Sequence, residues 1–273
     1  MKNSASRKQN TQVLAPRTRL WTPHNLPHLI AWYSLSTIER ETADGTHNKF
    51  LDVSGNGNDL ENLTSAQFPT VKVSSNFGNF KVLDFDGSGD NKDLLKVDPP
   101  PDSLDIGDGD FFFCAAIAAD AADANQTIMS LQRQSNDEEL RLFLTSGGVF
   151  TFRIIGTDTA SATGNLEGSV NIVYAERING SMKVYVNGTI GNKTDTSTLA
   201  IDNNTATILG ALNTSGQQIY DGQIGEVVYG GSTTKGIMDD FKRQRLEGYI
   251  AHRHKISSRL AATHPFRHGP PKI

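Results

Sequence analysis

The segment from Val170 to Ile190, VNIVYAERINGSMKVYVNGTI, constrains the fold of this chain more than any other. Two short β-prone runs flank Asn179-Gly180, and Asn187-Gly188 closes the second run. An Asn-Gly pair between such runs is a strong hairpin signal, because both central residues of a type I′ turn need a positive φ. In the second run, Met182 to Val186, the apolar side chains of Met182, Val184 and Val186 alternate with Lys183 and Tyr185. One face of this strand can therefore be buried and the other hydrated. The segment therefore predicts a two-stranded antiparallel unit that lies on a core.

Short strand-like runs separated by turn residues continue through most of the chain. They include LIAWYSLS, KVLDF, TIMSLQ, ELRLFLTSGG, VFTFRII, ATILGAL and GQIGEVVYG, together with DFFFCAAIAA, which is typical of a strand buried on both faces. About a dozen such runs with glycine-rich turns favour an antiparallel sandwich over alternating βαβ units. We therefore predict an all-β fold, an antiparallel two-sheet jelly-roll sandwich.

One segment, residues 233–255, favours a helix. It carries a broad apolar arc, and Thr233 or Thr234 is placed to cap its start. Basic residues crowd its carboxyl end, where the helix dipole favours cations. Gly248 would allow a neighbouring segment to approach closely. We expect a single C-terminal α-helix that closes one edge or end of the sandwich.

The 273 residues divide into three predicted parts. Residues 1–27 are polar, basic and interrupted by prolines, which predicts an extended arm. Residues 28–256 form the sandwich with its helix, and residues 257–273 form a basic extended tail. No apolar run approaches the roughly 18 residues needed to cross a bilayer, and the polar start does not resemble a secretory signal. We therefore expect a protein without a membrane partner.

The net charge of -4 conceals a strong asymmetry along the chain. Residues 1–38 and 248–273 hold ten of the 26 Lys and Arg residues and none of the 30 Asp and Glu residues, so residues 39–247 carry about -14. Basic ends of this kind can pair with acidic surfaces of neighbouring subunits or with nucleic acid, and the alternative is a solvated tail without a partner. We expect protein partners and a homo-oligomer rather than nucleic acid.

The arm contains a bulky pair that favours a docking function. An exposed Trp on an arm is costly unless something covers it. The predicted docking arm consists of Arg7, Lys8, Arg17, Arg19, Leu20 and Trp21.

An ordered set of short motifs resembles the laminin-G-like, concanavalin A-like jelly-roll family. The motifs are AWYSLS, DVSGNGNDL, VLDFDGSGD, KVYVNGT, ILGAL, YDGQIGEVVYG and LEGYIAHRHK followed by THPF, and together they span about Leu29 to Phe266. They are similar to the single-domain form found in environmental bacteria and their phages, although His254 and Phe266 replace the Trp and Tyr that are usual there. The resemblance implies a β-sandwich that binds glycans or proteins, often on exported or virion surfaces.

The sequence offers little for catalysis. A retaining glycosidase needs two carboxyl groups about 5 Å apart on one face, and no Glu-x-Asp-x-Glu run is present. Asp84 and Asp86 alternate beside Gly87, where turn capping is the favoured interpretation. The single cysteine, Cys114, lies in an apolar run and is interpreted as a buried small hydrophobe. We predict no catalytic residues.

Two kinds of binding residue are candidates. RQSNDEELRLFL is similar to a pentraxin stretch that ligates calcium, which would carry that role onto Asn136 and Asp137. Calcium needs roughly 6–8 oxygen ligands, and the acidic residues that pentraxins supply after ILG are missing here, so a solvated hairpin tip is the alternative. Tyr33, Tyr220 and Tyr229 are candidates for stacking on a sugar, and each could equally belong to the core. No other cofactor is expected.

Three functional hypotheses follow, in this order. The first is a non-enzymatic virion protein of a phage, anchored by its arm and C-terminal tail to other capsid or tail proteins and displayed as a decoration or appendage. The second is a glycan-binding adhesin, such as a tail-fibre lectin that recognises a cell-surface polysaccharide. The third is a polysaccharide hydrolase.

Overall fold

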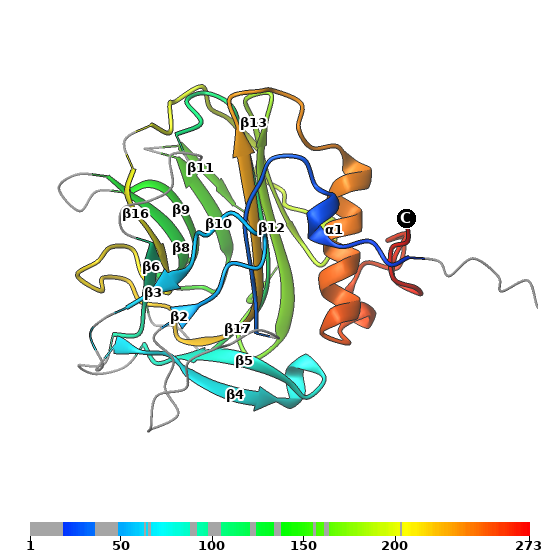
Figure 1. Cartoon of the computed structure of the whole chain (residues 1–273), viewed down its shortest axis with the longest axis horizontal. Coiled ribbons are helices and arrows are strands. Elements are labelled where there is room, and N and C mark those ends of the chain that lie inside the picture. Colours follow the sequence, from blue (N-terminus) through cyan, green and yellow to red (C-terminus); the bar gives the residue numbers. More distant parts are fainter. Residues whose placement is uncertain are drawn as a thin grey trace, which may run out of the picture.

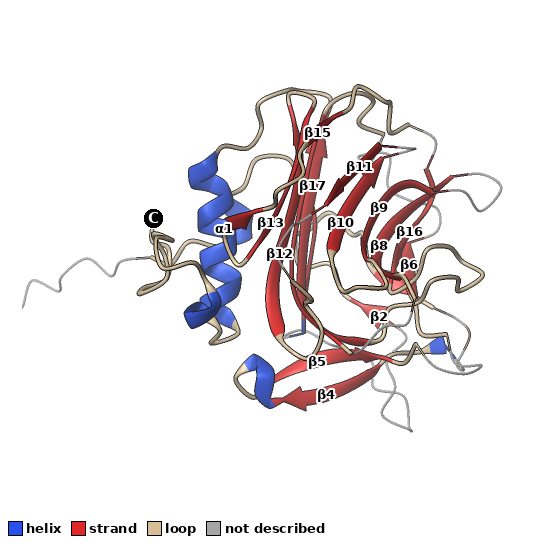
Figure 2. Cartoon of the chain, turned by 180° about the vertical axis from the view of Figure 1, so that it is seen from behind, coloured by secondary structure: helices blue, strands red, loops and turns tan. Residues whose placement is uncertain are grey.

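A computed structural model describes residues 19–35, 49–62, 64, 67–87, 92–97, 105–120, 124–133, 138–154, 157–160, 164–202 and 204–273. Two antiparallel sheets face each other, and one α-helix lies outside them (Figures 1 and 2). The predicted all-β sandwich with a C-terminal helix is confirmed. None of the described helices is long and apolar enough to span a bilayer.

The first sheet has nine strands in the order β14-β13-β12-β7-β17-β5-β4, with β1 also paired to β17 and β15 to β13. Its strands are β1 (Leu29–Ser34), β4 (Thr70–Ser74), β5 (Phe80–Phe85), β7 (Asp110–Ala119), β12 (Val170–Ile178), β13 (Ser181–Val186), β14 (Thr189–Ile190), β15 (Asp195–Thr196) and β17 (Gly222–Ser232).

The second sheet has eight strands in the order β11-β10-β9-β8-β16-β6-β3-β2. Its strands are β2 (Lys49–Phe50), β3 (Leu60–Glu61), β6 (Leu95–Val97), β8 (Gln126–Arg133), β9 (Glu138–Leu144), β10 (Phe150–Ile154), β11 (Thr157–Ala160) and β16 (Asn204–Leu209). Three 3-10 turns, at Pro23–Asn25, Ser75–Phe77 and Ser257–Arg259, complete the described regular elements.

The predicted hairpin is present with the predicted turn. Asn179 and Gly180 have φ values of 52° and 79°, and they join β12 to β13. The second pair, Asn187 and Gly188, has φ values of 53° and 81° and leads into β14. Both turns need positive φ at two consecutive positions, which Asn and Gly adopt with the least strain.

Strand β7 lies at the centre of the first sheet, between β12 and β17, and all ten of its residues are buried. Its inner face packs across the sandwich, where the rings of Phe111 and Phe152 lie 6.1 Å apart. Cys114 is fully buried, as predicted, and burial raises the pKa of its thiol well above the usual value. A strand covered on both faces explains why its sequence is continuously apolar rather than alternating.

Helix α1 (Asp240–Arg253) covers the outer face of the first sheet, where it contacts β7 and β12 (Figure 1). Its buried face is not purely apolar. Arg243 lies over the ring of Tyr185 at 3.8 Å and donates a hydrogen bond of 2.7 Å to the fully buried Glu247. His264 from the C-terminal segment lies 3.3 Å from the same carboxylate. These polar contacts join the sheet, the helix and the tail.

The helix begins later than predicted, because a distant side chain holds the preceding segment open. The carboxylate of Asp110 accepts hydrogen bonds from the amides of Gly236 and Ile237, the latter at 3.1 Å. Gly236 has a φ of 77°, which no α-helix accommodates. The N-cap is therefore Asp239, which accepts a hydrogen bond from the amide of Lys242 at 2.8 Å, and not Thr233 or Thr234.

Both described ends of the chain are packed on this helix layer. Trp21 is 3% exposed, and its ring lies 6.2 Å from that of Tyr249 in α1. Residues 19–27 therefore belong to the body, which corrects the predicted boundary at residue 27. The earlier part of the predicted arm, with Arg7, Lys8 and Arg17, lies outside the described residues.

The predicted extended tail, residues 257–273, also folds back onto the helix. Leu260 is fully buried, and a Cβ on Gly248 would lie 2.4 Å from the Cβ of Phe266. This contact confirms the expected close approach at Gly248. The tail ends in a short antiparallel pair with the start of the body, in which the amide of Ile273 donates to the carbonyl of Arg19 at 3.0 Å.

Candidate functional site

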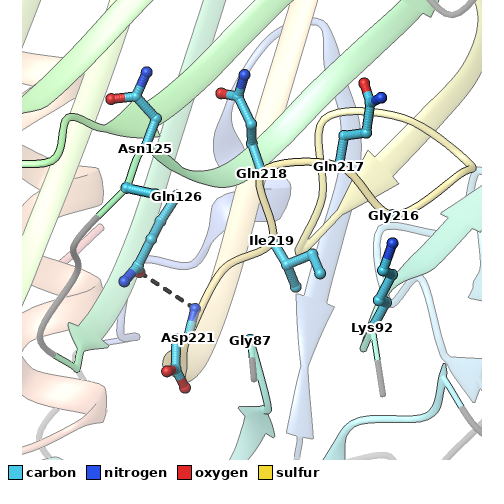
Figure 3. Close-up of a pocket in the computed structure, with 10 residues that line it drawn as sticks. Gly87, Lys92, Asn125, Gln126, Gly216, Gln217, Gln218, Ile219 and Asp221 are labelled. Atoms are coloured by element: carbon cyan, nitrogen blue, oxygen red, sulfur yellow. Dashed lines mark hydrogen bonds between the residues drawn. The ribbon is translucent and has the colours of Figure 1, made fainter. Parts of the chain in front are cut away.

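Three connections between strands meet at one rim of the sandwich and form the walls of an open cavity of about 670 Å³. One wall follows β5, the second is the connection from β7 to β8, and the third is the connection from β16 to β17 (Figure 3). The lining residues are mostly polar: Gly87, Lys92, Ala124, Asn125, Gln126, Gly216, Gln217, Gln218, Ile219 and Asp221. We refer to this cavity as the rim pocket.

The connection from β16 to β17 is shaped by its own side chains. Asn213 is buried and donates a hydrogen bond of 2.8 Å to the amide oxygen of Gln217. Its own oxygen accepts hydrogen bonds from the amides of Ser215 at 3.2 Å and Gln217 at 3.3 Å. Gly216 has a φ of 67°, and a Cβ there would lie 2.9 Å from the Cβ of Lys92. The loop is thus folded tightly against the opposite wall.

Gln218 occupies a strained backbone position at the pocket. Its φ of 47° places it in the left-handed region, which residues other than glycine adopt at a cost. Two long-range contacts hold it there. Its carbonyl accepts a hydrogen bond of 2.8 Å from the amide of Thr127, and its side-chain oxygen accepts one from the buried guanidinium of Arg141. The sandwich core therefore positions this loop directly.

The second wall presents two amide side chains with different roles. Gln126 is 4% exposed, and its side-chain oxygen accepts a hydrogen bond of 3.2 Å from the amide of Asp221. Asn125 is exposed and accepts a hydrogen bond of 3.1 Å from the amide of Ser146. Figure 3 shows Gln126 reaching toward Asp221, whereas Asn125, Gln217 and Gln218 extend away from it. Gln126 thus fixes the wall, and Asn125 remains available to a ligand.

Asp221, the carboxylate that lines the pocket, lies near other acidic residues. Burial, and after it the charges of Asp120, Asp86 and Asp84, raise the pKa of Asp221. Burial likewise raises the pKa of Asp93, next to Lys92 in the sequence, to about 6, and the charges of Asp86, Asp84 and Asp221 add to this rise. These side chains are close enough to oppose one another's ionisation.

The lining chemistry suits recognition of a hydroxylated ligand. Primary amides offer both donors and acceptors, which is what sugar hydroxyl groups require. Asp221 is the single carboxylate among the ten lining residues, so they do not supply the pair that a two-carboxylate glycosidase mechanism needs.

The three tyrosines proposed for stacking are all in the core. Tyr33 is 1% exposed and donates a hydrogen bond of 2.6 Å to the carbonyl of Asn58. Tyr229 is fully buried, with its hydroxyl 3.3 Å from that of Tyr33. Tyr220 is also fully buried, against Phe85. None of these rings is accessible to a sugar, so the alternative interpretation, a place in the core, holds for each.

The remaining predicted site residues are the two calcium candidates. Asn136 and Asp137, the calcium candidates, lie outside the described residues, and calcium binding stays a prediction. Among the residues that the structure describes, no three His, Cys, Asp or Glu side chains gather as a metal site. Asp84 lies in β5 and is paired with Lys72, so it does not cap a turn.

Sequence reasoning missed the rim pocket. Its signal was the run NTSGQQIYDG, in which polar amide residues lie between two glycines where a strand connection is expected. Such a run is typical of a binding loop carried by a rigid scaffold. What the sequence does not show is that this run faces Asn125 and Lys92.

Comparisons with known proteins identify the fold but no family. No protein family model matches the chain, and no curated protein sequence matches it. A Trypanosoma rangeli sialidase in complex with sialic acid superposes with a TM-score of 0.55 at 15% identity, over 82% of this chain and 33% of the sialidase. The binding domain of botulinum neurotoxin serotype D/C superposes with a TM-score of 0.56 at 13% identity, over 84% and 53%.

A third match is a structure of botulinum neurotoxin type C, whose cell entry depends on interaction with two ganglioside molecules. It gives a TM-score of 0.54 at 13% identity, over 82% of this chain and 51% of that one. This chain thus spans between one third and about half of the chains it resembles. The likeness, together with the two antiparallel sheets, shows a jelly-roll-like β-sandwich. The resemblance to the laminin-G-like family stays a prediction.

Proposed function

We propose that this protein is a non-enzymatic carbohydrate-binding module whose rim pocket binds a sugar. The observation that carries the proposal is the set of amide side chains at the pocket, held in place from the core by Arg141 and Asn213. Several proteins of the same fold are described with sialic acid or gangliosides, which supports the ligand class without assigning it. The module would act by attachment to a glycan.

The test is a glycan array followed by titration of any ligand found. Asn125→Ala and Gln217→Ala remove exposed lining amides and should weaken binding about five- to tenfold each, the effect of one lost hydrogen bond. Asn192→Ala, at an exposed amide elsewhere, is the matched control and should bind like the unmodified protein. An array without any binding, or binding that both pocket variants leave unchanged, would refute the proposal.

A second proposal concerns the setting of this module. We propose that it is attached to a virion, as a capsid decoration or tail appendage, through its basic ends. The distribution of charge supports this proposal, because Arg19 and Lys272 lie on the same helix layer, where the two ends pair. Basic groups gathered at one place can bind an acidic protein surface.

The attachment test uses a deletion that spares the body. Removing residues 1–18 keeps Trp21 in place, and the shortened protein should no longer assemble on particles. A variant with Lys193→Gln, a charge change on an exposed loop elsewhere, is the control. Normal incorporation of the shortened protein would refute attachment through this segment.

A further inference from the structure

A second cavity lies where the C-terminal end of α1 meets the first sheet. It measures about 300 Å³ and shares no lining residue with the rim pocket. Its walls come from the end of β1, the start of β5, the middle of β17 and the end of the helix, and they include Leu35, Phe80, Lys81, Arg253 and His254. We refer to this cavity as the helix-end pocket.

His254 is a buried residue of this pocket with one unsatisfied nitrogen. It is 4% exposed, and its ring meets the rings of Phe77 and Phe80 edge to face, with centroids 5.6 and 6.0 Å away. Its Nε2 lies 3.2 Å from a carboxylate oxygen of Glu226. Its Nδ1 has no hydrogen-bond partner among the described residues. Buried polar atoms are rarely left without a partner, and at the wall of a cavity a ligand can supply one.

The charged side chains at the helix-end pocket are cationic. Lys81 and Arg253 line it, and the ion pairs between described residues involve neither of them. Lys255 follows the helix, and its Nζ lies 5.3 Å from the centre of the Phe80 ring. Three cations from two separate segments therefore lie at one cavity.

Glu226 does not cancel this charge. It is fully buried behind His254, and its carboxylate also accepts a hydrogen bond from the indole of Trp32. The hydroxyl of Tyr249 is a further hydrogen-bonding partner of this carboxylate. Even at full charge, Glu226 offsets one of the three cations, so an anionic ligand is favoured at this pocket.

We propose that the helix-end pocket binds a carboxylate ligand with an apolar body. The guanidinium of Arg253 can hold a carboxylate through two parallel hydrogen bonds, and the ammonium group of Lys81 adds a second positive charge. Leu35 and Phe80 offer apolar contact to the rest of the ligand. When the imidazole of His254 carries both protons, its Nδ1 can donate to the same anion. This site is independent of sugar binding at the rim pocket.

The experiment compares four probes by calorimetry with the full chain at pH 7 and low salt: benzoate, its neutral isostere benzamide, glucuronate and inorganic phosphate. Benzoate should bind at least about tenfold more tightly than benzamide, because the cations attract only the charged ligand. It should also bind more tightly than glucuronate and phosphate, which lack an apolar body. Absence of benzoate binding, or equal binding of benzamide, would overturn the inference. Glucuronate or phosphate binding as tightly as benzoate would overturn the assignment of an apolar body.

A spectroscopic measurement assigns binding to this cavity without any substitution. In NMR spectra, the imidazole signals of His254 should shift when benzoate is added, and benzamide should shift them much less. The signals of His268, which is exposed in the C-terminal segment, should stay in place and serve as the control. Benzoate binding that leaves the His254 signals unchanged would overturn the inference.

Two variants test the cations. Arg253→Gln should weaken benzoate binding about tenfold, the effect of a lost charge-assisted hydrogen bond, and Lys81→Gln should weaken it about fivefold. Lys193→Gln, on an exposed loop elsewhere, and Asn125→Ala, at the rim pocket, are the controls and should leave benzoate binding unchanged. Benzoate binding that survives unchanged in both helix-end variants, or that falls equally in the controls, would overturn the inference.

Discussion

Asp93 gives a direct test of the crowding of carboxylates beside the rim pocket. Its side chain is 5% exposed, and burial is the largest of the effects that raise its pKa from 3.8 to about 6. The hydrogen bond from Asp86 opposes this rise, and the charges of Asp84, Asp86 and Asp221 add to it. An acid whose pKa is higher in the folded than in the unfolded state opposes folding when it ionises. Its cost is absent at low pH and grows as the pH rises from about 4 to about 6.

The size of the effect follows from this difference. A tenfold change in acid dissociation corresponds to about 1.4 kcal/mol, so a rise from 3.8 to about 6 costs about 3 kcal/mol once both states are ionised. Asp93→Asn removes the charge, and the amide oxygen of asparagine can still accept the hydrogen bond from Asp86. The variant should therefore gain about 1 kcal/mol in the free energy of unfolding near pH 4.5 and about 3 kcal/mol near pH 7.5.

The assay is urea denaturation followed by tryptophan fluorescence at pH 4.5, 6 and 7.5 and constant ionic strength. The informative quantity is how much the gain in the free energy of unfolding of the variant over the unmodified protein changes between pH 4.5 and pH 7.5, which should be about 2 kcal/mol. Packing effects that do not depend on pH cancel in this comparison. The control variant Asp120→Asn removes a nearby charge but keeps Asp93. This variant should therefore still lose the stability that ionisation of Asp93 costs as the pH rises. A difference between Asp93→Asn and the unmodified protein that stays constant with pH would refute the reasoning.

Three further predictions concern the fold. Gly180→Ala should cost about 1–2 kcal/mol in urea denaturation, because φ is 79° there. Gly147→Ala should cost little, because its Cβ would make only an ordinary contact of 3.9 Å with the hydroxyl oxygen of Thr145, and equal losses for the two variants would contradict this explanation. Glu247→Gln should cost about 3 kcal/mol by the same measurement, because it removes the buried carboxylate of this pair and leaves the guanidinium of Arg243 with the exposed carboxylate of Asp240. A loss below about 1 kcal/mol would show that the buried pair is dispensable. Deleting residues 1–27 should lower the thermal midpoint of unfolding, because it removes the buried side chain of Trp21, which contributes about 3–5 kcal/mol. Deleting residues 1–18 keeps Trp21 and is the control. Equal midpoints for the two deletions would exclude a stabilising role for Trp21.

The sheets could be predicted from the sequence because local signals decided them. Asn179-Gly180 defines both the place of a turn and the register of its strands. The run around Cys114 indicates burial on both faces without reference to any distant residue. Where local preference and tertiary structure agree, reading the sequence is enough.

The start of the helix could not be predicted, because the decisive contact is not local. Residues 233–239 have no strong signal against a helix apart from Gly236. What holds them open is the carboxylate of Asp110, which lies 127 positions before Ile237 in the sequence. The folded ends were missed for a similar reason. Trp21 is covered by Tyr249, and no pattern within residues 1–27 shows that cover.

The candidate site depends on the same kind of distant contact. Gln218 is held by Arg141, 77 positions earlier in the sequence, and the sequence gives no sign of this pair. The three tyrosines proposed for stacking show another limit of prediction from the sequence. An aromatic residue in a strand can face a ligand or the core. The alternation of side chains along a strand does not reveal which faces of the sheet are covered, because the second sheet lies on one side of it and a helix on the other.

The short pair between Leu20 and Lys272 determines how the body responds to tension. Because residues 19 and 273 lie side by side, a force applied between them would break the backbone hydrogen bonds of this short pair one after another. Pulling from residue 19 alone, against a ligand held in the rim pocket, would instead load the central strands along their length. A tether at that end would then transmit load through many backbone hydrogen bonds at once.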